Sequence, residues 1–367
     1  MIKRKKNRVI TYISIYLFFF IVGDILFSNF IYKKDVQSNC YKYTEYFHYL
    51  KKNCYAKEKW LKYSLSYDVH TDNNGFRFSG KKNNNNLNKI ATFSGGSFTY
   101  GMGLDHKKTF VGLVENAKKE FKIMNLGVPG YSTSAFNYQL KELINNKIYP
   151  KKIFVVLDVL DVSNEASLWD KKDGYDHPVK VRKNIIDEVN DHSLQNLKKK
   201  NFKGSRLIAR SINNFFRSIK LYFSTLGEKP KESIKTPWGS FLYTDLDDTE
   251  QWLWEPFGFN QGIFKVTKNI EEISKIAKSI NADFYIIIYP WPDALGYGQT
   301  NFNWEEFANN LCISVSCTKL INLFPDFKYI KETSDDWIRK LYFKNDMHLQ
   351  KFGHKTVAKK ILEFGFN

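Results

Sequence analysis

The sequence predicts an α/β domain with a mostly parallel sheet and helices on both of its faces. Two uninterrupted apolar runs, 153–157 and 284–289, are typical of strands that are buried on both sides. Another short strand, 89–94, leads directly into a glycine-rich loop. Segments suited to helices alternate with these strands, and this alternation predicts parallel strands joined by helical crossovers.

The expected elements follow one another with a local signal for each. Apolar runs mark the strands, and hydroxyl residues that can cap free backbone N–H groups mark the starts of helices. In chain order the elements are a strand at 89–94, a helix from Thr109 to about Phe121, a strand at 122–126, a helix capped by Ser132 or Ser134 and ending near Asn146, strands at 153–157 and 284–289, and a helix at 353–364.

The composition suits a folded domain of this kind. Of 367 residues, 43% are hydrophobic and 26% are charged, so the chain can bury a core and global disorder is excluded. Four cysteines are too few for a disulfide-framework protein. The formal net charge of +18 is accompanied by no nucleic-acid-binding motif. We therefore expect no nucleic-acid partner.

The N-terminal region predicts a membrane anchor. A basic cytoplasmic tail, 1–8, precedes an apolar run, 9–30, that has the roughly 20 residues a helix needs to cross a bilayer. Asp24 is the only charged residue of the run and lies toward its outer end. The positive-inside rule then places everything after the run outside the cytoplasm. A cleavable signal peptide is the alternative, although no small-residue cleavage site is evident.

The rest of the chain divides into two regions. A juxtamembrane segment, 31–88, is rich in Tyr and Lys and ends in an asparagine tract that favours turns. The α/β domain occupies 89–367. Within it, residues 166–261 lack clear strand signals and form an insertion, which either shapes a substrate cleft or is a helical elaboration packed on the core.

All four cysteines follow the predicted anchor and form two local pairs, Cys40 with Cys54 and Cys312 with Cys317. Outside the cytoplasm each pair could oxidise to a disulfide, and four unpaired thiols are the alternative. Neither pair has the spacing of a structural zinc site. We expect neither a metal nor another cofactor.

The glycine-rich loop carries the first chemical candidate, Ser97. Met102 stands where a phosphate loop requires lysine, and His106 stands where a dinucleotide-binding motif requires its third glycine. A serine on a tight strand-to-helix turn can instead present its hydroxyl at the end of the sheet, with amides nearby to bind an oxyanion. An ordinary glycine-rich turn is the alternative.

Asp346 and His348 supply the second candidate, directly before the final helix. An imidazole can act as a general base, and a carboxylate close in sequence can orient it. Alone, His348 would be an ordinary core or surface histidine. Together with Ser97, the pair favours nucleophilic catalysis.

These motifs together resemble the SGNH/GDSL hydrolase superfamily. Residues 72–77 are similar to the N-x-x-G-F-R segment that precedes the catalytic domain of many exported members. Residues 97–101 match the first block, commonly G-D-S-F-T-x-G, and 125–133 match the second. Asp346 and His348 match the last block. The resemblance implies a three-layer α/β/α, flavodoxin-like sheet and serine-dependent ester chemistry.

The resemblance also assigns roles to individual residues. It implies that Ser97 is the nucleophile, His348 the base and Asp346 the group that holds the imidazole. The amides of Ser97 and Gly130 would bind the oxyanion. Two departures lie nearby, in the first and third blocks.

The departures concern the aspartate of the first block and the asparagine of the third. Gly96 replaces the aspartate, and Leu160 stands where the family has its oxyanion asparagine. Losing one such donor typically costs ~10² to 10³ in rate unless another group, with Asn164 the candidate, supplies it. A catalytically inactive SGNH-fold protein that binds or assembles glycans is therefore the alternative to an enzyme.

Substrate, partners and location follow from the same resemblance. With water as acceptor the reaction is ester hydrolysis, and with a sugar hydroxyl it is O-acetyl transfer. Anchored members often belong to polysaccharide O-acetylation systems. The resemblance thus implies a glycan or acyl-ester substrate, a multi-pass membrane acyltransferase as partner, and a catalytic domain in the periplasm or at the cell surface.

Overall fold

The computed structural model describes most of the α/β domain and little of the N-terminal region. The described residues are 15–16, 18–24, 26, 39–45, 47–59, 66–80, 89–180, 256–299, 302–343 and 346–366. Within these ranges, no helix is both long and apolar enough to cross a membrane. Most of the anchor expected at 9–30 lies outside the described residues. The chain forms two compact units, and the unit that contains the sheet comprises 37–183 and 234–367.

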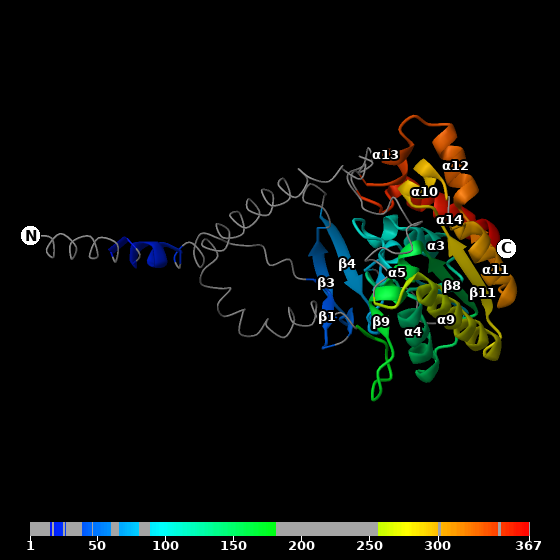
Figure 1. Ribbon diagram of the computed structural model, residues 1–367, viewed down its shortest axis with the longest axis horizontal. Coiled ribbons are helices and arrows are strands. Elements are labelled where there is room, and N and C mark those ends of the chain that lie inside the picture. Colours follow the sequence, from blue (N-terminus) through cyan, green and yellow to red (C-terminus); the bar gives the residue numbers. More distant parts are fainter. Residues whose placement is uncertain are drawn as a thin grey trace, which may run out of the picture. The chain divides into compact units, whose positions relative to one another are not determined.

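An eight-stranded sheet forms the centre of this unit (Figure 1). In spatial order its strands are β12 (Lys319–Asn322), β11 (Asp283–Ile288), β8 (Lys152–Leu157), β6 (Lys89–Ser94), β7 (Phe121–Asn125), β5 (Arg77–Phe78), β4 (Tyr67–Thr71) and β3 (Tyr55–Glu58). The strands from β12 to β7 are parallel, which confirms the prediction of a mostly parallel sheet. Their order is the flavodoxin-like order, with β8 in the middle of the five and β6 between β8 and β7.

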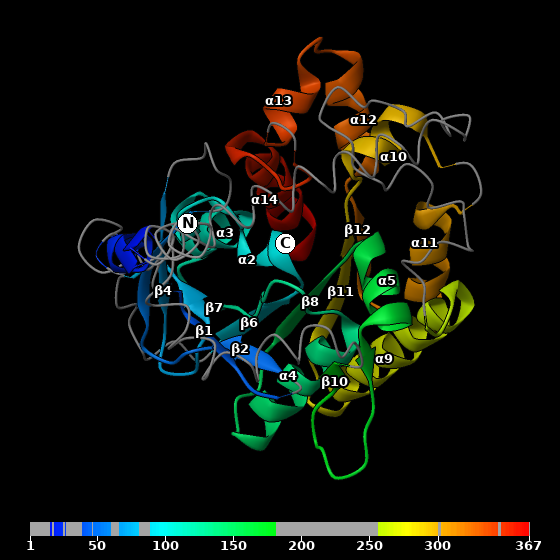
Figure 2. The same ribbon diagram turned by 60° about the vertical axis from the view of Figure 1, so that its left-hand side comes forward.

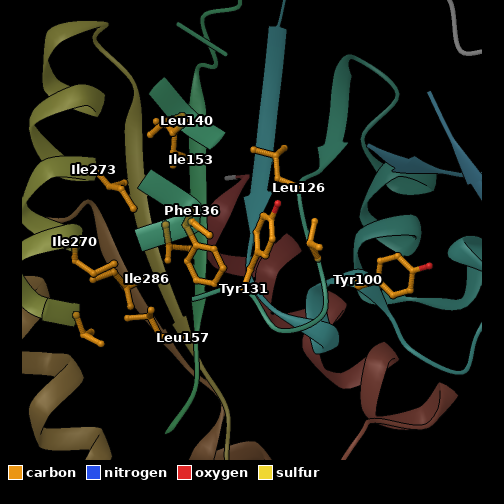
Figure 3. Packing of buried hydrophobic residues seen from close by; sticks show 14 of the residues in the cluster. Tyr100, Leu126, Tyr131, Phe136, Leu140, Ile153, Leu157, Ile270, Ile273 and Ile286 are labelled. Atoms are coloured by element: carbon orange, nitrogen blue, oxygen red, sulfur yellow. The ribbon is translucent and has the colours of Figure 1, made fainter. Parts of the chain in front are cut away.

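Helices cover both faces of the parallel strands (Figure 2). On one face lie α4 (Thr133–Asn145), α5 (Val159–Ser167), α9 (Phe259–Ser279) and α11 (Trp304–Ser314), and on the other lie α3 (Phe110–Ala117) and α14 (Lys351–Gly365). Strand β8 shows why its sequence is uninterrupted and apolar. Its alternate residues point to opposite faces of the sheet. Ile153 and Leu157 belong to the core beneath α4 and α9, here called the first core, and Phe154 belongs to the core beneath α3 and α14, the second core. Figure 3 shows the first core between α4, α9 and the sheet.

Shorter elements complete the unit. They are β1 (Tyr41–Tyr43), β2 (His48–Leu50), β9 (Trp169–Asp170), β10 (Val179–Lys180), α2 (Ser97–Tyr100), the 3₁₀ turn η2 (His106–Lys108), α10 (Pro292–Tyr297), α12 (Phe324–Glu332) and α13 (Trp337–Leu341). Strands β1 and β2 form an antiparallel hairpin, and so do β9 and β10.

Two helix starts differ in how they are capped. Thr109 caps α3 as expected, because its hydroxyl accepts a hydrogen bond from Gly112 N at 3.2 Å. Helix α3 ends at Ala117 rather than near Phe121, because Phe121 is already the first residue of β7. Ser132 stands at the N-cap of α4, but its hydroxyl instead donates to a buried carboxylate, that of Glu165, at 2.6 Å.

The boundary expected at residue 89 is wrong for the described residues. Strands β3 to β5 belong to the same sheet, and Arg77 of β5 pairs with Asn125 of β7. Residues Tyr67–Thr71 alternate between buried and half-buried positions, which is the pattern of an antiparallel strand with one face on a core. The folded unit therefore begins near residue 37.

The structure describes only the two ends of the expected insertion. Of the insertion at 166–261, residues 181–255 lie outside the described residues, so its role stays a prediction. The described ends form the β9–β10 hairpin and the first turn of α9.

Both cysteine pairs are disulfides, as predicted, with Cα atoms 5.7 Å apart for Cys40–Cys54 and 5.0 Å apart for Cys312–Cys317.

Candidate active site

Ser97 lies on a tight turn at the carboxyl end of β6. Gly95 makes this turn possible, because a Cβ there would lie 2.0 Å from Thr99 Oγ1. Ser97 is the first residue of the one-turn helix α2 and is half-buried. Its hydroxyl is thereby held at the end of the sheet, as the sequence predicted for a serine in this loop.

Ser97, His348 and Asp346 form a continuous chain of hydrogen bonds. The Ser97 hydroxyl lies 2.7 Å from Nε2 of His348, and Nδ1 of His348 lies 2.6 Å from Oδ1 of Asp346. The carboxylate can only accept, so Nδ1 carries the imidazole proton and Nε2 is left to accept the proton of Ser97. The structure thus brings together three residues that are separated by as many as 251 positions.

The imidazole of His348 is held in place from several sides. The same carboxylate oxygen of Asp346 also accepts from the His348 backbone N–H at 2.7 Å, which closes the loop around the pair. Phe98, next to Ser97, stacks on the His348 ring with centroids 4.8 Å apart. Asp346 and His348 are 5% and 6% exposed. A buried carboxylate that accepts two hydrogen bonds is suited to orient a base without acting as one.

The loop that carries Gly130 lies against the nucleophile turn. Val128 N donates to Gly95 O at 3.1 Å, and a Cβ on Gly96 would lie 3.5 Å from Tyr131 O. Gly130 is exposed and has φ +80°, a conformation that favours glycine. Among the described residues, the amides of Ser97 and Gly130 donate no hydrogen bond to the protein. Both remain available to an oxyanion.

The site stands where the sheet topology favours ligand binding. The chain passes from β6 to β7 on one side and returns across β6 to form β8 on the other, so strand order reverses between β6 and β8. Ligands in open α/β sheets bind outside the carboxyl ends of the strands at this point. Ser97 follows β6, and Asp158 follows β8.

The third block is occupied by a structural carboxylate rather than by an amide donor. Asp158 caps α5 by accepting from Leu160 N at 2.8 Å, and it also accepts from the hydroxyl of Tyr289 at 2.5 Å. The Leu160 side chain packs against the core on the α3 and α14 face. It therefore supplies no donor to the site, in agreement with the departure noted in the sequence.

Asn164, the candidate substitute donor, lies one turn further along α5 and is half-buried. In the part of the chain that the structure describes, no hydrogen bond joins its side chain to Ser97, Gly130 or His348. The structure thus brings together the candidate triad and the Gly130 loop, but it does not connect Asn164 to them.

Two buried carboxyl groups add an electrostatic feature beside the triad. Burial raises the pKa of Asp158, although the hydrogen bond from the Tyr289 hydroxyl opposes this rise. Burial, and then the charge of Asp158, raise the pKa of Asp161 well above its ordinary value. The charge of His348 also opposes the rise in the pKa of Asp158.

Two residues that the sequence did not single out hold these loops. Asn125, at the end of β7, donates to Thr99 O and accepts from Gly127 N, each at 2.9 Å, and so ties the nucleophile helix to the second block. Glu165 is fully buried and accepts from the hydroxyls and backbone at the start of α4. The asparagine lies inside the quoted second block. The glutamate has no local signal, since its partners are about 30 positions away.

Within the described ranges, no group of three or more His, Cys, Asp or Glu side chains could hold a metal ion.

Comparisons with known proteins give similarity only at the level of solved structures. No protein-family model matches the chain, and no curated protein sequence is detectably similar to it. Similar structures include a member of the lipolytic G-D-S-L family from Veillonella parvula, with 12% identity, a TM-score of 0.40, and coverage of 75% of this chain and 96% of that one. Another is the acetyl xylan esterase AlAXEase, with 13% identity, a TM-score of 0.40, and coverage of 75% and 98%.

A third similar structure is a catalytic mutant of Axe2, an acetylxylan esterase from Geobacillus stearothermophilus. The identity is 10%, the TM-score is 0.41, and the match covers 76% of this chain and 95% of that one. Similarity this distant does not carry an activity from those proteins to this one. What this chain can do follows from its own site.

Proposed function

We propose that the chain is a serine-dependent enzyme that breaks or transfers acyl esters. One observation carries the proposal, namely the Ser97–His348–Asp346 chain of hydrogen bonds beside two backbone amides with no acceptor among the described residues. Serine, base and orienting acid in this order form the arrangement that activates a hydroxyl for attack on a carbonyl. The resemblance of the sequence to SGNH/GDSL hydrolases supports the same chemistry.

In the first half-reaction, Ser97 Oγ attacks the acyl carbonyl while its proton passes to Nε2 of His348. The carbonyl oxygen becomes an oxyanion, which accepts from the amides of Ser97 and Gly130. The imidazolium then gives its proton to the departing alcohol, and the acyl group remains on Ser97. Asp346 keeps Nδ1 protonated throughout.

In the second half-reaction, an acceptor hydroxyl attacks the acyl-serine. His348 takes the acceptor's proton and returns it to Ser97 Oγ as the bond to the serine breaks. Water as acceptor gives an esterase, and a sugar hydroxyl gives an O-acetyltransferase. We propose a cell-surface glycan as substrate or acceptor, by resemblance to anchored SGNH proteins. Measuring free acetate against acetylated glycan separates the two acceptors.

The proposed setting is the outer side of a membrane. The basic tail at 1–8 and the apolar run at 9–30 support an anchor with the catalytic unit outside the cytoplasm, and two disulfides are compatible with that compartment. A multi-pass membrane acyltransferase is the proposed partner that delivers the acetyl donor. A reporter fused to the C-terminus, active only outside the cytoplasm, is the expected result, and a reporter active only in the cytoplasm would contradict this setting.

The second candidate is a glycan-binding protein without catalysis, which the apolar packing of Leu160 at the third block favours. A single experiment discriminates between the two. The full-length chain is treated with a serine-directed fluorophosphonate and assayed with p-nitrophenyl acetate. We expect an adduct on Ser97, and loss of turnover in Ser97→Ala and His348→Ala to about the same level, because triad members act as a unit.

The exposed Ser279 provides a matched control. It lies at the end of α9, and its hydroxyl donates a hydrogen bond to Ile276 O within the same helix. Ser279→Ala should keep both labelling and turnover. Asp346→Ala should retain more activity than Ser97→Ala, because it orients the base without transferring the proton. Folded wild-type protein that neither hydrolyses the ester nor forms an adduct would establish the binding protein instead.

A further inference from the structure

Two side chains from outside the matched motifs bind the backbone on either side of Gly130. Nε2 of His48 lies 2.8 Å from the carbonyl oxygen of Pro129, and Nε1 of Trp169 donates to the carbonyl oxygen of Gly130 at 3.2 Å. His48 belongs to the β1–β2 hairpin and Trp169 to the β9–β10 hairpin. Neither residue lies in the segments that resemble the hydrolase blocks.

The bond to Pro129 acts directly on the oxyanion donor. The Pro129 carbonyl and the Gly130 N–H belong to one planar peptide group, in which C=O and N–H point in opposite directions. A donor that fixes the carbonyl therefore also fixes the direction of the N–H. Hydrogen bonding at the carbonyl polarises the same amide and makes its N–H a stronger donor.

Gly130 makes such an anchor necessary. Its φ of +80° lies in the region that glycine enters freely, so the flanking peptide groups have little steric restraint of their own. A flip of the 129–130 peptide would reverse the direction of the Gly130 N–H. Hydrogen bonds to both flanking carbonyls, from His48 and Trp169, oppose such a flip.

The surroundings hold His48 in one orientation. It is 4% exposed, its ring is parallel to that of Trp169 with centroids 6.2 Å apart, and its backbone carbonyl accepts from the Tyr131 hydroxyl at 2.5 Å. Burial, and then the charge of Lys180, lower the pKa of His48 to about 4. The ring is therefore neutral near pH 7, and its single proton sits on Nε2 because Pro129 O can only accept.

The other ring nitrogen shows that packing alone does not account for a histidine here. Nδ1 of His48 is buried and has no hydrogen-bond partner among the described residues. A buried polar atom without a partner is unfavourable by ~1–3 kcal/mol, so an apolar ring of similar size would pack better. The Nε2 donor is the one property of this side chain that such a ring would lack.

We propose that His48, assisted by Trp169, is a positioning residue that fixes the Gly130 amide as an oxyanion donor. The inference rests on the proposed ester chemistry. It places the β1–β2 hairpin, which Cys40–Cys54 ties to β3, within the catalytic unit. Neither side chain needs to touch the substrate, since both act through the Gly130 loop.

The test compares two substitutions in the full-length chain. His48→Phe keeps a ring but removes the donor, while His48→Gln restores an N–H near the position of Nε2. With p-nitrophenyl acetate, we expect His48→Phe to lower kcat by about 10- to 100-fold, less than the ~10² to 10³ for outright loss of a donor, with KM within about two-fold. His48→Gln should recover most of the lost kcat.

His70→Phe is the matched control, because the ring of His70 of β4 lies against that of Tyr55, with centroids 4.8 Å apart, at the far edge of the sheet. It should leave kcat unchanged. If His48→Phe does not fold, Trp169→Phe takes its place in the test. This substitution keeps a six-membered ring and removes the pyrrole part of the indole with its N–H donor, and we expect the same fall in kcat at constant KM.

The outcomes separate this inference from the proposed function. An active wild type whose kcat is unaffected by His48→Phe, or equally low kcat in His48→Phe and His48→Gln, would overturn the positioning role and leave the ester chemistry standing. A change confined to KM would also overturn it. A wild type that is inert and forms no adduct at Ser97 would overturn both.

Discussion

Arg77 offers the sharpest test of how the nucleophile turn is supported. The residue is 1% exposed, and its guanidinium donates to three carbonyls at and just beyond the end of α2, those of Tyr100, Gly101 at 2.9 Å and Leu104 at 2.5 Å. A fourth bond reaches Asp68 O at 3.3 Å. Replacement by methionine keeps much of the volume and removes every donor.

The expected loss can be worked from these contacts. Hydrogen bonds to a charged group contribute about 1.5–3 kcal/mol each, so four of them give a gross loss of about 6–12 kcal/mol. The guanidinium no longer has to be desolvated, which returns several kcal/mol. Glu58, a buried carboxylate bonded to Tyr67 and Tyr100, keeps its two hydroxyl donors but loses the cation that stacks on both rings. We expect Arg77→Met to lower the free energy of unfolding by about 3–5 kcal/mol.

Urea unfolding followed by circular dichroism and tryptophan fluorescence measures this change. Arg339→Met is the matched control, because Arg339 is 69% exposed and lies 3.7 Å from Asp336 on the surface. A surface pair of this kind contributes less than about 0.5 kcal/mol. Arg77→Lys, which keeps the charge but not the forked donors, should fall between the two. A loss of less than about 1 kcal/mol in Arg77→Met would refute the reasoning.

Two further predictions concern acid and the disulfide of the N-terminal hairpin. Because burial lowers the pKa of His48 from 6.5 to about 4, the unfolded chain binds a proton in this window that the folded chain does not. His48 should therefore contribute a fall of up to about 3 kcal/mol in the free energy of unfolding as pH drops from 6.5 to 4, beside the contribution of His354, whose pKa burial lowers to about 3. Urea titrations across this range should show a shallower slope for His48→Gln, and an unchanged slope would contradict the assignment. Replacing both Cys40 and Cys54 with serine should lower the unfolding free energy by about 3 kcal/mol, the loop-closure value for a ring of this size, and should lower kcat as well. The same urea and ester assays check this, and unchanged stability would rule out the loop-closure account.

The parallel core could be predicted because its signals are local. The runs at 153–157 and 284–289 are apolar throughout, since both faces of β8 and β11 are buried under helices. Thr109 could be recognised as a helix cap from its own neighbours. The candidate triad could be proposed because short motifs around Ser97 and His348 resemble those of a known superfamily.

What could not be predicted depends on contacts between distant parts of the chain. Strands β3 to β5 carry only a weak alternating pattern, and nothing in it indicates pairing with β7. His48 and Trp169 lie 81 and 39 positions from the carbonyls they bind. Their role exists only after the sheet has brought the two hairpins to the Gly130 loop.

The base of the insertion is closed by a backbone bond, since Phe257 N donates to Ala166 O at 3.0 Å. The chain that leaves the sheet after α5 therefore returns beside the point of its departure. Lengthening a loop whose ends are already held together is inexpensive, at about 0.6 kcal/mol for each doubling. This position can accept additions and deletions of sequence with little effect on the sheet. Trp169 sets the limit, because a deletion that removes β9 would also release the Gly130 carbonyl.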